Sequence, residues 1–175
     1  MTANENLSGL SISDTVTPPL ESKADVGQGG QFVSFLIGER AYCVDIMSVR
    51  EIKAWSTTTV LPNAPDYVRG VLNLRGTIVP IHDLRIRFGE GMTEAGDTHV
   101  IVIVAVAERI AGLLVDAVSD ILTVNQDETK PIPVGSSTSK TNYLSGLISI
   151  NGELTAILDL ERLFEGSDAS TETQH

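Results

Sequence analysis

The chain has 175 residues, of which 42% are apolar and 20% are charged, a composition typical of a soluble protein with a buried core. Its 23 acidic and 12 basic side chains give a formal net charge of −11, which repels phosphate backbones and anionic lipid and argues against nucleic acid as a partner. The longest apolar stretch, residues 100–107, has eight residues, far fewer than the roughly 20 that cross a bilayer as a helix, so no direct membrane insertion is expected.

The two ends of the chain differ from its middle. Residues 1–30 are rich in Ser, Thr, Gly, Pro and acidic residues and contain no aromatic side chain, so ordering them would bury too little apolar surface to offset the lost entropy. We therefore predict a disordered N-terminal tail over 1–30 and, by the same argument, a flexible C-terminal tail over 166–175. Residues 31–165 are expected to form the folded domain.

Between the tails, nearly every apolar run has the length or the alternation of a strand. Residues 32–37 and 70–81 are rich in Leu and β-branched residues, and the second run contains Arg75-Gly76, a two-residue turn that suits a hairpin. The helical candidates are short segments, 45–49, 83–88 and 159–164, and each begins with an Asp that can cap the first amides. These elements predict an all-β fold with a few short helices.

The chain also contains an internal repeat. Residues 67–88 match residues 143–164 without a gap at an offset of 76, and seven of the 22 positions are identical. Residues 32–40 match 101–109 at an offset of 69, which also places Val49, Glu51 and Ile52 on Val118, Asp120 and Ile121. A chance match of two β-rich segments is possible, but the recurring Tyr, Gly, Asp, Leu and Phe favour a duplication. The two copies, 32–88 and 101–164, have a size at which a lone core is marginal, so we expect them to support each other.

No constellation of residues predicts catalysis, a metal site or a cofactor. Three histidines are too few and too scattered for a metal site, and the single cysteine, Cys43, permits no intrachain disulfide and fits a reducing cytoplasm. His82 beside Asp83 is a weak signal for a catalytic dyad, and a core or surface histidine is favoured about three to one. Asp116 and Asp120 could pair in a cleft, but one capping carboxylate and one solvated strand end are favoured.

Two charged residues do not fit an ordinary surface. Glu51 lies in the apolar context of Val49 and Ile52, and Arg75 occupies a hairpin turn where the second copy has Asn151. An Arg–carboxylate pair can organise a surface for a partner, whereas an ordinary exposed ion pair contributes at most about 1 kcal/mol. Residue types alone favour neither interpretation.

Three runs carry a resemblance to a known family: VREIKAW (49–55), LPNAPDYVRGVLNLRGTIVPIHDLRIRF (61–88) and VIVIVAVAERIAGLLVDAVSDIL (100–122). They closely resemble the CheW-like modules of bacterial chemotaxis coupling proteins, over roughly residues 31–164. The resemblance implies two five-stranded SH3-like or OB-like barrels with exchanged strands. It also implies a cytoplasmic, non-enzymatic adaptor that couples chemoreceptors to the CheA histidine kinase and helps to control kinase activity in membrane-bound receptor arrays.

The resemblance further implies partners and a binding site. The partners would be the cytoplasmic tip of methyl-accepting chemotaxis receptors, the regulatory domain of CheA and other CheW-like modules in rings. Receptor contact would lie in the groove between the barrels, and the residues at contact or supporting positions would be Val49, Glu51, Arg75, Val100, Ile101 and Ile121. Core packing remains an alternative for Val100, Ile101 and Ile121, because alternating apolar strands are core more often than interface.

Overall fold

The computed structural model describes residues 29–133, 135 and 141–165. The predicted tails, apart from Gly29 and Gly30, and part of the loop that lengthens the second copy therefore lie outside the described residues. The first strand begins at Gly30, two residues earlier than the apolar run beginning at Phe32 indicated.

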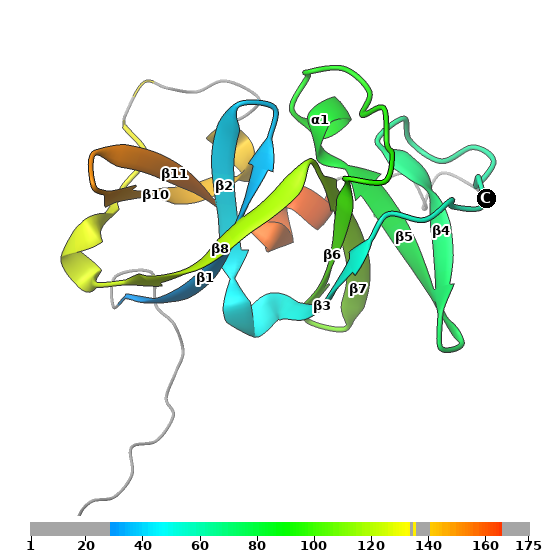
Figure 1. Cartoon of the computed structure of the whole chain (residues 1–175), viewed down its shortest axis with the longest axis horizontal. Helices are drawn as coiled ribbons and strands as arrows, with labels where there is room; N and C mark the ends of the chain where they lie inside the picture. The colour runs from blue at the N-terminus through cyan, green and yellow to red at the C-terminus, as the bar shows by residue number, and fades with distance from the viewer. Residues whose placement is uncertain (1–28, 134, 136–140, 166–175) are drawn as a thin grey trace, which may run out of the picture.

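The described residues form two β-sheets, which make up the two lobes in Figure 1. We call them barrel A and barrel B. Barrel A has the strand order β8 (Ala117–Val124), β1 (Gly30–Ile37), β2 (Arg40–Asp45), β11 (Glu153–Leu158), β10 (Leu144–Ile150) and β9 (Thr129–Lys130). Barrel B has the order β3 (Val49–Ala54), β6 (Val100–Val106), β7 (Arg109–Val115), β5 (Thr77–Asp83) and β4 (Val68–Leu74).

Short helices connect these strands. The α-helix α1 (Leu84–Arg87) follows β5, residues 160–165 are helical after β11, and 3₁₀ turns occur at η3 (Ile46–Ser48), η4 (Gln126–Glu128) and η5 (Thr141–Tyr143). The fold is all-β with short helices, as the sequence predicted.

Strand exchange between the two copies is visible in the strand orders. Strands β1 and β2 of the first copy lie in barrel A beside β8, β10 and β11 of the second, while β6 and β7 of the second copy lie in barrel B with β3, β4 and β5 of the first. Each barrel has one parallel pairing, which brings Ile81 opposite Gly112 in barrel B and Ile157 opposite Cys43 in barrel A. These are equivalent positions at the offsets of 76 and 69, so the duplication and the exchange are both confirmed.

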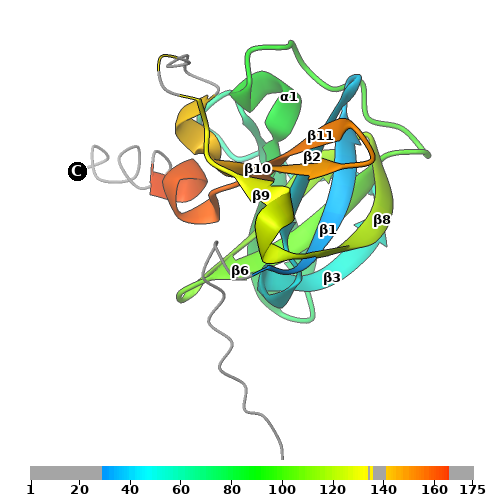
Figure 2. The same cartoon turned by 90° about the vertical axis from the view of Figure 1, so that its left-hand side faces the viewer.

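The largest buried cluster lies between the barrels rather than inside either one. It contains sixteen of the described residues and we call it the shared core. They come from β1, β2, β6 and β7, from α1 and Phe88 after it, and from the end of β11 and the helical residues after it. The buried clusters inside barrel B and barrel A contain five and four residues. Most apolar burial therefore requires both copies at once, which accounts for the mutual support expected from their small size. Figure 2 shows the strands of barrel A in front of those of barrel B.

The hairpins β4–β5 and β10–β11 have the same tight turn. Arg75 and Gly76 have φ values of 51° and 90°, and Asn151 and Gly152 in the second copy have 53° and 84°. Positive φ at both central residues defines a type I′ turn, whose twist matches that of the flanking strands. The hairpin predicted at Arg75-Gly76 is confirmed.

The three predicted Asp caps are also present. The Asp83 side chain accepts a hydrogen bond from the Arg85 amide at 3.0 Å, and Asp159 accepts one from the Arg162 amide at 3.2 Å. Asp45 accepts from the Met47 amide at 2.8 Å, but the segment that it caps is one 3₁₀ turn. The strand β3 begins at Val49, directly after this turn.

Candidate partner-binding surface

The histidine that could have formed a catalytic dyad is a core residue. His82 is 2% exposed and packs against the rings of Tyr67 and Phe164, with centroid distances of 5.4 and 5.2 Å. Burial, and secondarily the charge of Arg87, lowers the pKa of His82 to about 4, so the ring is neutral near pH 7. The favoured interpretation of His82 as a core or surface histidine is confirmed.

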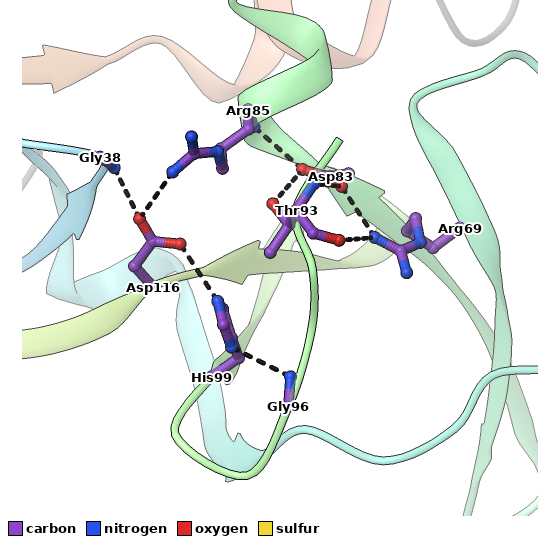
Figure 3. A network of polar contacts seen from close by, with 8 residues as sticks. All are labelled: Gly38, Arg69, Asp83, Arg85, Thr93, Gly96, His99 and Asp116. Carbon is purple, nitrogen blue, oxygen red and sulfur yellow. Dashed lines mark hydrogen bonds and ion pairs between the residues drawn. The ribbon is translucent and has the colours of Figure 1, made fainter. Parts of the chain in front are cut away.

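Its neighbour Asp83 is fully buried and has structural partners. The carboxylate accepts hydrogen bonds from Arg69 at 3.0 Å and from the Thr93 amide and hydroxyl at 2.9 and 2.6 Å (Figure 3). Together with its cap on α1, these bonds fix the loop after α1 to the end of β5. The hydrogen bonds of Asp83 therefore stabilise the fold of barrel B.

The carboxylates of Asp116 and Asp120 have separate partners. Asp116 accepts hydrogen bonds from the Gly38 amide at 2.6 Å and from Arg85 at 3.3 Å, and its other oxygen lies 3.3 Å from His99 Nε2 (Figure 3). Asp120 accepts from its neighbouring amide, that of Ile121, on an exposed part of β8. Asp120 fits the solvated strand end that was predicted, whereas Asp116 is a bridge between the barrels rather than a helix cap.

Other features bear on ligand chemistry. Within the described part of the chain, no group of three or more His, Cys, Asp or Glu side chains is arranged to hold a metal ion. Cys43 is buried, and burial raises the pKa of its thiol to about 12, so it is not a reactive thiolate near neutral pH.

None of the helices among the described residues is long and apolar enough to span a membrane.

Glu51 and Arg75 form an ion pair on the surface of barrel B. Glu51 lies on β3 and Arg75 in the turn between β4 and β5, and Arg75 Nη1 is 3.0 Å from Glu51 Oε2. The Glu51 side chain is 28% exposed and that of Arg75 is 79% exposed. The pair therefore joins one edge strand of barrel B to the hairpin at the opposite edge of the same sheet.

A β-bulge determines which face of β3 each side chain occupies. Val49 lies opposite Val104 on β6 and Glu51 lies opposite Ile103, so Arg50 is the extra residue. Val104 belongs to the shared core and Ile103 to the interior of barrel B. Val49 is consequently on the side of the shared core, and Glu51 is on the side of the barrel interior, from which it reaches Arg75.

The edge strand of barrel A presents an equivalent surface. Ile121 on β8 lies opposite Val33, a shared-core residue, and is 53% exposed. Ile52, its counterpart on β3, lies opposite Val102 of the shared core and is 45% exposed. The two edge strands thus expose matching isoleucines on the sides of the sheets that face the shared core. The 3₁₀ turn η3 leads into β3 and contacts both β1 and β6.

The six predicted site residues do not form one continuous patch. Ile101 is fully buried inside barrel B and can only support the surface. Val100 is half-buried and lies opposite Ala54, whereas Val49 lies opposite Val104. Val100 and Val104 are four positions apart along β6, which is about 13 Å at the usual rise of a strand. Glu51 and Arg75 form an ion pair, Val49 lies on the same strand as Glu51, and Ile121 lies in barrel A.

Sequence reasoning missed two exposed apolar residues near these positions. Ile52 could have been found, because the offset of 69 makes it the counterpart of the predicted Ile121. Met47 is 72% exposed in the turn η3, just before Val49. Its position next to the edge of β3 depends on the path of the turn, which no residue pattern indicated.

Paired barrels with exchanged strands, exposed aliphatics on their edge strands and a surface ion pair define a module that binds other proteins. The CheW-like domain family matches residues 31–168. The chain is 40% identical over 140 residues to the chemotaxis protein CheW of Rhizobium meliloti (strain 1021), covering 80% of this chain and 90% of that protein. It is 34% identical over 140 residues to that of Klebsiella aerogenes, covering 80% and 84%.

The crystal structure of the scaffolding protein TtCheW from Thermoanaerobacter tengcongensis has the same architecture. It superposes with a TM-score of 0.73 at 32% identity, covering 79% of this chain and 94% of that one. The chain belongs to the CheW-like family.

Proposed function

We propose that this protein is a non-enzymatic chemotaxis adaptor that couples chemoreceptors to the CheA histidine kinase and helps to control the activity of that kinase. The observation that carries the proposal is the difference between equivalent surfaces of the two barrels. Barrel B has the Glu51–Arg75 ion pair, whereas the equivalent positions in barrel A are Asp120 and Asn151. Two related but chemically different faces suit a protein that must hold two partners at the same time.

The receptor site is assigned to the edge of β3 and the inter-barrel side of β8. The cytoplasmic tip of a receptor is a helical hairpin, whose apolar stripe can be buried by Val49, Ile52 and Ile121. The Glu51–Arg75 pair at the rim would fix the register of that hairpin, since charged groups at a rim contribute more to specificity than to affinity. Val100 and the buried Ile101 support β3 from the neighbouring strand β6, with which it pairs.

Exposed apolar residues beside the outer hairpin turns are assigned to the kinase. Ile78 on β5 and its counterpart Leu154 on β11 are 59% and 61% exposed near the outer hairpin turns of the two barrels. Apolar residues at both ends of the molecule would allow contact with the CheA regulatory domain and with other CheW-like modules in rings. Holding receptor and kinase together raises their effective concentration without any chemical step. The place of action is the cytoplasmic side of membrane-bound receptor arrays.

The proposal is tested by reconstitution with a receptor signalling fragment and the cognate kinase. Glu51→Arg and Arg75→Glu should each weaken receptor co-sedimentation at least tenfold and abolish receptor-dependent kinase stimulation, while the swapped double variant should recover part of the binding. Circular dichroism and the melting temperature should stay near wild type, because an exposed ion pair contributes at most about 1 kcal/mol to folding. Full kinase stimulation by both single variants would refute the assignment.

A further inference from the structure

The backbone of Arg75 has a conformation that its residue type disfavours. Its φ of 51° lies in the left-handed region, where the Cβ of an L-residue meets the following carbonyl and which Gly and Asn tolerate best. The equivalent residue of barrel A, at φ 53°, is Asn151, a residue that suits this conformation. The first copy therefore holds an arginine where the second copy has the more favourable side chain. Backbone strain of this kind persists only where the surroundings enforce it.

A side chain from the preceding strand holds this turn. The Asn73 Oδ1 atom accepts a hydrogen bond from the amide of Gly76, the second turn residue, at 2.9 Å. Asn73 lies opposite the exposed Ile78 at the end of the hairpin ladder, and Leu74 opposite Thr77 closes it. The second copy has Ser149 at this position, opposite Leu154. A serine hydroxyl is attached one bond closer to the backbone than an asparagine amide oxygen and reaches less far across a turn.

The ion pair depends on the direction in which this turn points. Arg75 is 79% exposed, so packing does little to fix its long side chain, and its Nη1 atom nevertheless lies 3.0 Å from Glu51 on a strand at the other edge of the sheet. An exposed pair of flexible side chains is weak because holding both in one geometry costs entropy. A backbone fixed at the base of the arginine reduces that cost by limiting the directions in which the side chain can extend.

We propose that Asn73 is a positioning residue for receptor binding: its side-chain oxygen holds the Arg75–Gly76 turn in the geometry from which the Arg75 guanidinium meets Glu51. The partner then encounters a preformed charge pair rather than a mobile arginine. This inference rests on the proposed receptor site for its biological meaning, but the positioning itself is a property of the free protein. Asn73 acts through Arg75 and makes no contact with the partner.

The test in the free protein is the mobility of the Arg75 side chain, measured as the order parameter of its Nε–H group by NMR relaxation. Asn73→Ala should lower this order parameter toward that of a freely moving surface arginine. Ser149→Ala, the matched change in barrel A, should leave it unchanged. An Arg75 side chain equally ordered in the wild type and in Asn73→Ala would overturn the inference, whatever the receptor result.

The test with the receptor fragment is a double-mutant cycle with Arg75→Asn, which gives the first copy the turn residue of the second. Asn73→Ala should weaken receptor binding roughly threefold to tenfold, the range expected for loss of one hydrogen bond. In the Arg75→Asn background the same change should have an effect of less than about twofold, because nothing remains to be positioned. Equal weakening in both backgrounds would mean that Asn73 acts directly and would contradict the inference.

A different result would separate this inference from the proposed function. If Asn73→Ala loosens Arg75 in the free protein, but neither Asn73→Ala nor Arg75→Asn affects receptor binding, the positioning is upheld and the receptor site assigned to the pair is refuted.

Discussion

Barrels A and B have the same strand connections but different chemistry at equivalent positions. His82 of barrel B corresponds to Leu158, Arg87 to Leu163, Arg75 to Asn151 and Glu51 to Asp120. Barrel B also has a buried carboxylate with four hydrogen bonds at Asp83, whereas Asp159 in barrel A is partly exposed. Polar specialisation has thus accumulated in barrel B, on a framework in which the pairing of strands has remained equivalent.

The interface between the barrels shows the same asymmetry. Arg87 of α1 lies over the rings of the equivalent residues Tyr67 and Tyr143, at 4.1 and 4.7 Å, and donates a hydrogen bond to the carbonyl of Leu163 at 2.7 Å. An arginine of the first copy therefore donates a hydrogen bond to the carbonyl of its own counterpart in the second copy.

The largest effect is expected from the shared core. Phe88 and its counterpart Phe164 are both 2% exposed, and replacing either with Ala should lower the free energy of unfolding by about 3–5 kcal/mol. Denaturant unfolding followed by circular dichroism and by tryptophan fluorescence should show one coincident transition for each variant. Two separated transitions would mean that the barrels are stable independently, and would contradict the dependence of both barrels on the shared core.

The next effect concerns pH and distinguishes the barrels. The folded protein lowers the pKa of His82 from 6.5 to about 4, so below pH 6.5 the unfolded chain binds a proton that the folded chain does not. Stability supplied by neutral His82 is therefore complete above pH 6.5 and is lost as the pH falls toward 4, by a total of about 3 kcal/mol.

His82→Leu supplies the matched variant, because Leu158 is the counterpart in barrel A. It should remove this part of the pH dependence and be at least as stable as the wild type at pH 7, since Nδ1 of His82 is buried without a hydrogen-bond partner. Urea denaturation from pH 4 to 7 measures both. An unchanged pH profile in His82→Leu would contradict the assignment to His82.

The smallest effect on stability is expected at the bridge between the barrels. Asp116→Asn keeps an acceptor for the Gly38 amide but removes the charge that faces Arg85 and His99. These groups are partly exposed, so the expected loss is about 1 kcal/mol. Met47 is the counterpart of Asp116 and is 72% exposed, so Met47→Asn should be neutral in thermal melts. Equal losses in the two variants would show that the bridge contributes nothing.

Local patterns predicted much of this architecture. The Arg75-Gly76 hairpin and the Asp83 cap depend on residues close together in the chain, and the repeat is visible when the sequence is aligned with itself. Strand exchange came only from the resemblance to a family, because a repeat is equally compatible with two barrels that keep their own strands. Which strands meet across the molecule is decided by burial of the shared core, and no local signal specifies that.

The sequence singled out the two charged residues of the candidate site, but it did not indicate on which face of its sheet each site residue lies. Glu51 and Arg75 stood out because both are charged residues in apolar or turn contexts. The resemblance gave Val100 and Ile101 a contact or supporting position, with core packing as the alternative; Val100 is half-buried, whereas Ile101 is fully buried inside barrel B and is a core residue. The bulge at Arg50 interrupts the alternation of side chains between the two faces of β3. A sequence pattern that assumes strict alternation cannot show where such an extra residue lies.

We propose that the barrels have diverged and that barrel B carries the charge pair for the receptor. One comparison of binding affinities tests this proposal. Isothermal titration of a receptor signalling fragment with Glu51→Arg and with Asp120→Arg applies the same charge reversal to equivalent strands. We expect at least tenfold weaker binding for Glu51→Arg and a change of no more than about twofold for Asp120→Arg. Equal losses in the two variants, or a larger loss in Asp120→Arg, would contradict it.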